Sequence, residues 1–158
     1  MSTPPTDAPH HTVTGGCRCG RVRFRGTTAG LKAVACACAD CQRSSGTFVS
    51  VAVGLAAASF EVTAGHDDLG TFADTGESGQ PVHRSFCRTC GSPLFARPAS
   101  YDHIVSVRAV ALDAPCTTRP IFSIFDENVP EWMHFDGVPS MDDDEASEAA
   151  ETATASND

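Results

Sequence analysis

Seven of the eight cysteines in this chain fall into three short clusters, and this clustering constrains the fold more than any other feature. Residues 1–11 hold three prolines and no apolar stretch that could form the core of a secretory signal, so we expect a cytoplasmic location. In that reducing compartment, closely spaced thiols are more often metal ligands or catalytic groups than disulfides. The clusters, which together predict metal binding, are Cys17-x-Cys19, Cys36-x-Cys38-x-x-Cys41 and Cys87-x-x-Cys90.

The spacing of these cysteines favours one set of four and one set of three. A C-x-x-C pair can face one metal ion because the backbone turns between the two cysteines, and the C-x-C pair can complete that site. Four sulfur ligands close a structural zinc site, whereas three protein ligands and an exchangeable fourth position are typical of catalytic zinc. We therefore predict a structural Zn²⁺ on Cys17, Cys19, Cys87 and Cys90, and a catalytic Zn²⁺ on Cys36, Cys38 and Cys41.

Length and charge indicate one soluble domain without a nucleic-acid or membrane partner. The 158 residues fit a single domain, and no apolar run is long enough for a membrane helix. The net charge of −9 is concentrated at the C-terminus, so the remainder is nearly neutral and lacks the basic excess of a nucleic-acid-binding protein. We expect a flexible leader (1–11), one zinc-binding domain (12–139) and a disordered acidic tail (140–158), with no nucleic-acid or membrane partner.

Short runs rich in Val, Phe, Thr and Ile alternate with Gly, Pro and Asp, which predicts an all-β fold. The expected strands are Arg21–Arg25, Leu31–Ala35, Thr47–Val53, Phe60–Thr63, Gly70–Ala73, Val82–Phe86, Leu94–Arg97 and Ile104–Val110. Helical turns are expected only within Cys41–Gly46, Leu55–Ser59 and Asp126–Trp132. Arg21, Arg23 and Arg25 give the first strand a basic face, which is either solvated or suited to binding carboxylates.

The three clusters and their flanking residues resemble the glutathione-dependent formaldehyde-activating enzyme family, also called the centromere-protein-V-like domain family. The likeness rests on Gly16-Cys17-x-Cys19-Gly20, on the central cluster followed by Arg43 and Ser45-Gly46, and on Phe86-Cys87-x-x-Cys90-Gly91. The resemblance implies a β-tent fold and a carbon–sulfur lyase that joins formaldehyde and glutathione into S-hydroxymethylglutathione. It also implies the same division of the cysteines between structural and catalytic zinc.

Several residues near the central cluster are candidates for substrate binding. Arg43 could bind a carboxylate and Ser45 a hydroxymethyl group, although a serine beside Gly46 is also a common turn residue. Asp40 is either an exposed turn residue or a proton shuttle. The second zinc site could be completed by one of His66, His83, His103 and His134. We expect Cys116 to be an ordinary surface or packing cysteine. We expect Trp132 and Phe135 to pack against the sheet.

Three functions remain open from the residues alone. The first is a zinc-dependent lyase that acts on a small thiol and an aldehyde, with the thiol held as a thiolate. The second is a zinc-stabilised binding module without catalysis. The third is a thiol redox protein, which the β-rich pattern disfavours because redox C-x-x-C motifs belong to α/β folds. The sequence leaves open whether the chain forms a homodimer.

Overall fold

The computed structural model describes residues 10–29, 32–76, 78–114 and 119–141, and it confirms the predicted mainly β fold. The strands are β1 His10–Gly16, β2 Arg23–Ala29, β3 Ala33–Cys36, β4 Ser50–Ala56, β5 Glu61–Ala64, β6 Leu69–Thr75, β7 Pro81–Cys87, β8 Pro93–Pro98, β9 Ile104–Arg108, β10 Phe122–Ile124 and β11 Ser140–Met141. The described residues form one α-helix, α1 Ala39–Ser45, and the 3₁₀ turns η1 Ala57–Ser59, η2 Ala99–Tyr101, η3 Ala109–Ala111 and η4 Asp126–Asn128.

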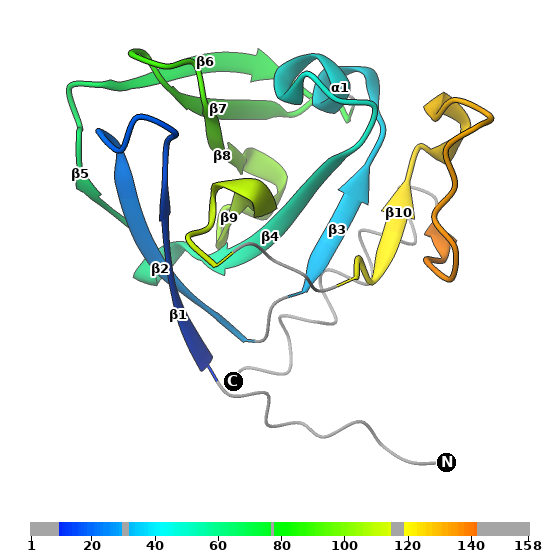
Figure 1. Cartoon of the computed structure of the whole chain (residues 1–158), viewed down its shortest axis with the longest axis horizontal. Coiled ribbons are helices and arrows are strands. Elements are labelled where there is room, and N and C mark those ends of the chain that lie inside the picture. The colour runs from blue at the N-terminus through cyan, green and yellow to red at the C-terminus, as the bar shows by residue number, and fades with distance from the viewer. Residues whose placement is uncertain (1–9, 30–31, 77, 115–118, 142–158) are drawn as a thin grey trace.

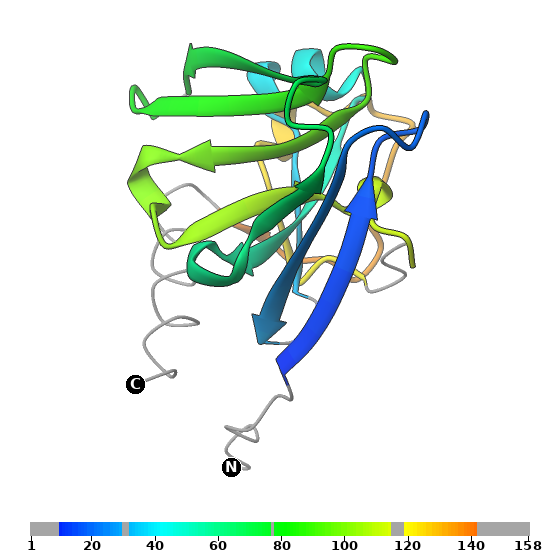
Figure 2. The ribbon, with the colours of Figure 1, turned by 90° about the vertical axis from the view of Figure 1, so that its left-hand side faces the viewer.

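The strands form a small and a large sheet (Figure 1). The small sheet has the order β1-β2-β5, and the large sheet has the order β11-β10-β3-β4-β9-β8-β7-β6. Pairing is antiparallel except that β10 runs parallel to both β3 and β11. Figure 2 shows β6 to β9 as one layer, with the hairpin of β1 and β2 crossing beside it. This topology places the end of β3, where Cys36 lies, between β4 and β10.

The hydrophobic core lies between the two sheets. Phe24 of β2 is almost fully buried, and its ring lies 5.6 Å from that of Phe60 and 6.2 Å from that of Phe95. The β2 backbone passes close to β4 at Gly26. A Cβ atom added there would lie only 3.1 Å from Leu55 Cδ1, so glycine allows this close approach. Burial of these large side chains supplies most of the driving force that holds the small sheet on the large one.

Every predicted strand overlaps an observed one, but β1, β10 and β11 were not predicted. The segment of β1, HHTVTGG, carries one large apolar residue, and β10 and β11 are only three and two residues long. Such segments lack a clear period-two pattern, so their pairing depends on neighbouring strands. The predicted helical turns correspond to α1, η1 and η4.

The basic face of β2 and its preceding turn is paired with carboxylates of the same chain. Arg21 lies 3.7 Å from Asp68, Arg25 lies 2.8 Å from Glu61, and Arg23 contacts Asp113. These ion pairs favour the interpretation of this row as a surface strand face.

Some sequence predictions concern parts of the chain that are not described. Residues 1–9 and 142–158 and Cys116 lie outside the described residues, so the division into leader, domain and tail stays a prediction. None of the helices in the described ranges is long and apolar enough to cross a membrane.

Candidate metal centres

The first candidate centre joins the ends of two hairpins. Cys17 and Cys19 lie in the turn between β1 and β2, and Cys87 and Cys90 lie where β7 turns into β8. The four Sγ atoms lie within 4.8 Å of one another. Sulfur atoms that surround a zinc ion at about 2.3 Å stand about 3.8 Å apart in a tetrahedron. The Sγ atom of Cys19 lies 3.4 Å from that of Cys17 and 3.8 Å from that of Cys87, so the four thiols fit a zinc ion.

Both turns are shaped by backbone hydrogen bonds and end in a glycine with a positive φ. The Gly20 N–H donates to the Cys17 carbonyl at 3.0 Å, and the Gly91 N–H donates to the Cys87 carbonyl at 2.8 Å. The φ angles are 78° at Gly20 and 74° at Gly91, a region that residues with a Cβ rarely adopt. The Arg18 N–H donates to Ser92 Oγ at 3.1 Å and so links the two turns.

We expect Gly20→Ala and Gly91→Ala each to reduce the free energy of unfolding by about 1–2 kcal/mol, because a Cβ penalises the left-handed conformation. No atom lies within 4 Å of a Cβ added at either position, so the penalty is conformational and not a steric clash. Urea denaturation of the zinc-loaded protein measures it. Asparagine tolerates this conformation better, so Gly91→Asn should lose less stability than Gly91→Ala; an equal loss in both would contradict this explanation.

The protein environment favours the thiolate form of Cys17 and Cys90 in this first centre, whereas at Cys19 a backbone hydrogen bond from Arg21 is outweighed by burial and the neighbouring thiols, which raise the pKa to about 12. Burial opposes ionisation of Cys17, but the Val22 N–H, 3.2 Å from its Sγ, and the neighbouring thiols outweigh this effect and lower the pKa of Cys17. Hydrogen bonds from the Ser92 side chain and backbone lower the pKa of Cys90 to about 5. Since zinc binds the thiolate form, these contacts favour metal binding.

The second candidate centre lies where β3 leads into α1. Cys36 ends β3, Cys38 is the N-cap of α1, and Cys41 lies in the first turns of the helix. The Cys41 N–H donates to Cys38 Sγ at 3.4 Å, which orients the Cys38 side chain. The three Sγ atoms lie within 4.8 Å of one another, and no fourth histidine, cysteine or acidic side chain in the described ranges joins them.

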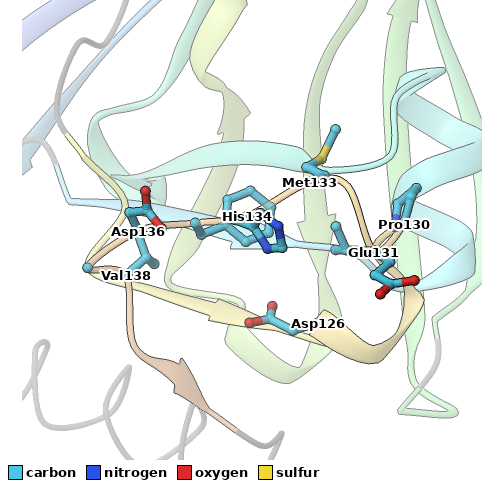
Figure 3. Close-up of a pocket in the computed structure, with 10 residues that line it drawn as sticks. Asp126, Pro130, Glu131, Met133, His134, Asp136 and Val138 are labelled. Carbon is cyan, nitrogen blue, oxygen red and sulfur yellow. The ribbon is translucent and has the colours of Figure 1, made fainter.

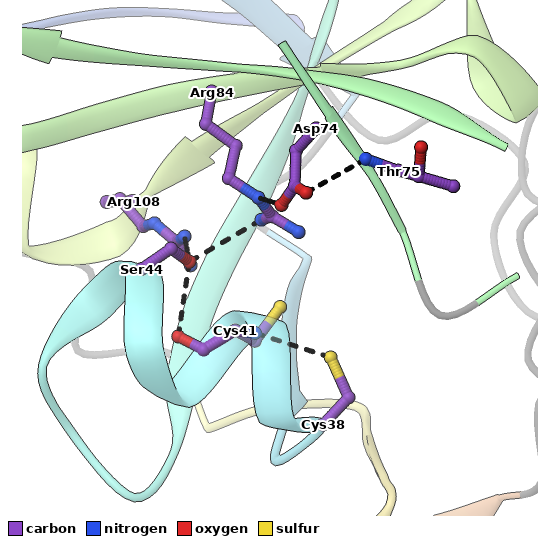
Figure 4. Close-up of polar contacts among 7 residues, drawn as sticks. All are labelled: Cys38, Cys41, Ser44, Asp74, Thr75, Arg84 and Arg108. Atoms are coloured by element: carbon purple, nitrogen blue, oxygen red, sulfur yellow. Dashed lines mark hydrogen bonds and ion pairs between the residues drawn. The ribbon is translucent and has the colours of Figure 1, made fainter. Parts of the chain in front are cut away.

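Two arginines from distant strands lie beside this second centre (Figure 4). Arg108 ends β9 and is only 8% exposed, and Arg84 lies in β7 with a half-buried side chain. Arg108 Nη2 donates to Ser44 Oγ at 3.0 Å, and Ser44 Oγ donates to the Cys41 carbonyl at 3.3 Å. Arg108 also donates to Ser50 Oγ. Both guanidinium groups are thus held next to the last cysteine of the cluster.

Burial lowers the pKa of Arg108, and the negative charges of the nearby cysteines oppose this effect. Among the described residues, no carboxylate forms an ion pair with Arg108, although a buried cation is costly unless negative charge lies nearby. Hydrogen bonds from the Cys36 and Cys38 thiols lower the pKa of Cys41, and the positive charges of Arg108 and Arg84 lower it further. These contacts favour the thiolate form of Cys41, whereas hydrogen bonds with Cys38 and Cys41 raise the pKa of Cys36, and the pKa of Cys38 is also raised. The arginines therefore stabilise negative charge on Cys41 in particular.

Comparison with known proteins identifies a family whose model spans both candidate centres. The family described as glutathione-dependent formaldehyde-activating enzyme matches residues 12–128, which include all seven clustered cysteines. The chain belongs to this family. No significant match was found among curated protein sequences.

A solved structure shares the fold. The crystal structure of a Rhodobacter sphaeroides protein, determined as a structural genomics target, superimposes with a TM-score of 0.54 at 20% sequence identity. The match covers 81% of this chain and 99% of the Rhodobacter chain.

Two residues of this formaldehyde-activating family member were predicted to bind substrate, Arg43 and Ser45. Both lie on α1. Arg43 is exposed and lines a pocket beside the second centre, as does half-buried Asp40. The Ser45 hydroxyl donates to the Cys41 carbonyl at 2.7 Å and contacts Thr47 Oγ1 at 2.9 Å, so it is engaged in the helix end. A substrate role for Arg43 and Ser45 stays a prediction.

Sequence reasoning missed Arg84 and Arg108. Both are distant in sequence from Cys41, so cysteine spacing could not point to them. Arg108 did carry a signal, because it is a charged residue within the apolar run Ile104–Val110. His66, His83, His103 and His134 do not join the second centre.

A larger pocket of about 540 Å³ lies in the segment after β10 (Figure 3). Asp126, Glu131, His134 and Asp136 line it, and no cysteine does. Trp132 lies outside this pocket and is 69% exposed, with its ring 5.6 Å from that of Phe48. The prediction that Trp132 packs against the sheet is therefore wrong, because its ring packs on the loop that follows α1.

Proposed function

We propose that this protein is a zinc-dependent carbon–sulfur lyase that interconverts formaldehyde and glutathione with S-hydroxymethylglutathione. The observation that carries the proposal is the convergence of Cys36, Cys38 and Cys41 without a fourth ligand among the described residues. Three thiolates and an exchangeable position suit a zinc ion that must bind a substrate. Membership of the glutathione-dependent formaldehyde-activating enzyme family supports the choice of substrates.

The charges around the second centre support a thiol as the fourth ligand. Three thiolates already exceed the charge of Zn²⁺, so a fourth thiolate adds further negative charge to a largely buried site. Arg108 and Arg84 place two positive charges next to Cys41. In this proposal they offset the charge and make an anionic ligand acceptable.

In the proposed reaction, a sulfur–carbon bond forms and the carbonyl π bond of formaldehyde breaks. Zinc, when bound, stabilises the substrate sulfur as a thiolate at neutral pH. The proton released from the thiol ends on the former carbonyl oxygen, so the addition is balanced without an oxidant or reductant. Cys36, Cys38 and Cys41 hold the metal, while Arg84 and Arg108 stabilise the charge of the thiolate form. The reverse reaction cleaves the same bond.

The four-cysteine centre has a structural role in this proposal. Cys17, Cys19, Cys87 and Cys90 would close around one zinc ion and join the ends of the β1–β2 and β7–β8 hairpins. This gives one structural and one catalytic zinc ion in each chain. A cytoplasmic location, which keeps the thiols reduced, is part of the proposal.

The activity is tested by carbon-13 exchange spectroscopy between free and thiol-bound formaldehyde at equilibrium. We expect the zinc-loaded protein to accelerate exchange, because a catalyst raises forward and reverse rates together. Cys41→Ala should remove the acceleration and retain the structural zinc, whereas Cys116→Ala, which changes the cysteine outside the clusters, should behave like the wild type. If the wild type with both sites loaded leaves exchange unchanged for glutathione and for other small thiols, a non-catalytic binding module is the better description.

A further inference from the structure

A pocket of about 290 Å³ lies between α1 and the strands β6 and β7, beside the second centre. Its lining residues are Asp40, Arg43, Ser44, Phe72, Asp74 and Arg84. Ser44 connects it directly to the cysteines, because its hydroxyl donates to the Cys41 carbonyl at 3.3 Å. The pocket is therefore a neighbour of the second centre, where the proposed function places the substrate sulfur.

The charges that line the pocket are balanced. Two guanidinium groups, from Arg43 and Arg84, face two carboxylates, from Asp40 and Asp74. Such a pocket complements a group that carries one positive and one negative charge better than it complements a simple anion. The exposed ring of Phe72, 58% accessible, adds an apolar wall that suits a short methylene chain.

Arg84 is held in place but keeps donors for a ligand. Its Nε donates to Asp74 Oδ2 at 3.0 Å, and Asp74 Oδ1 accepts from the Thr75 N–H at 2.9 Å (Figure 4). Arg84 Nη1 reaches Ser44 Oγ at 3.5 Å. A guanidinium has five N–H donors, so these contacts orient the group and leave further donors to bind a carboxylate.

Resting on the proposed function, we propose that this pocket binds the α-amino-acid end of the thiol peptide. The substrate α-carboxylate lies on Arg84, with Arg43 at its edge, and the α-ammonium group faces Asp40. In glutathione this end belongs to the γ-glutamyl residue, whose methylene groups lie along Phe72. The pocket thus selects thiols that carry a free amino-acid group over neutral thiols.

The test uses γ-glutamyl-2-aminobutyryl-glycine, in which a methyl group replaces the glutathione thiol, so that binding does not depend on a sulfur–zinc bond. Isothermal titration of the zinc-loaded wild type should show binding, and Arg84→Gln should weaken it by at least about tenfold, because a charge-assisted contact is lost. Arg25→Gln, which removes a surface arginine paired with Glu61, is the matched control and should bind like the wild type.

A second ligand keeps the proposal testable even if Arg84→Gln does not fold. The glutaryl analogue lacks the α-amino group and should bind the wild type more weakly than the parent peptide. The pocket assignment would be overturned if the wild type bound the peptide and its glutaryl analogue with equal affinity. It would also be overturned if folded Arg84→Gln bound the peptide as tightly as the wild type does. An analogue that fails to bind while the wild type still accelerates exchange overturns the pocket alone. Arg84-dependent binding without any acceleration supports the pocket and overturns the lyase.

Discussion

Cys87→Ala is expected to abolish soluble, folded protein. Cys87 is fully buried at the end of β7, and it is one of the four thiols that converge between two hairpins. A structural zinc site contributes about 10–16 kcal/mol that is coupled to folding, and a whole domain is stable by only about 5–15 kcal/mol. Loss of one ligand forfeits enough of that energy to unfold the domain. Soluble yield, circular dichroism and thermal unfolding measure the effect.

Cys38→Ala provides the matched comparison, because it removes a buried thiol from the other centre. We expect this variant to remain folded with one zinc ion fewer, since α1 keeps its backbone hydrogen bonds and the four-cysteine centre is intact. Metal quantification on both variants shows which site was lost. If thermal unfolding damages the two variants equally, the assignment of structural and catalytic roles to the two centres is wrong.

Arg108→Gln is expected to lower the zinc affinity of the second centre by about 10–100-fold, the usual effect of removing a partner of metal ligands. The Arg108 guanidinium is buried and its positive charge helps to lower the pKa of Cys41, so it would offset the negative charge of three zinc-bound thiolates. Competition with a chromophoric zinc chelator measures the affinity of each centre, and the four-cysteine centre serves as an internal reference that should not change.

Arg108→Lys separates charge from packing in the same experiment. Lysine keeps the positive charge but loses the forked contacts with Ser44 and Ser50, so its zinc affinity should fall between those of the wild type and Arg108→Gln. An Arg108→Gln protein that is folded and binds zinc as tightly as the wild type would show that the arginine is only a packing residue.

Much of the arrangement of the cysteines was predictable because it is local in sequence. A C-x-x-C pair such as Cys87 and Cys90 can meet at one ion because a single tight turn joins its members, and Gly91 completes that turn with its positive φ. The division into four and three follows from counting such pairs. The alternation of Val22 and Phe24 with arginines likewise predicted a strand with one buried face, since strand side chains alternate between faces.

Strand pairing was beyond the reach of the sequence. β10 is three residues long, and it becomes a strand because Ile124 pairs with Cys36 and Phe122 with Val34. Those hydrogen bonds are made with segments far away in the chain, and no local pattern records them. Within the described ranges, β11 likewise becomes a strand through its pairing with β10.

The surroundings of Cys36, Cys38 and Cys41 were decided by tertiary structure alone. Arg84 in β7 and Arg108 in β9 lie beside Cys41 because both strands belong to the large sheet next to α1, where both arginines contact Ser44. From the sequence, Arg43 was the better candidate because it is close to Cys41 along the chain. The spacing of cysteines along the chain determines which thiols can share a metal ion. The charges beside that site come from strands that are distant in sequence. Which of these strands become neighbours is set by the packing of the whole core.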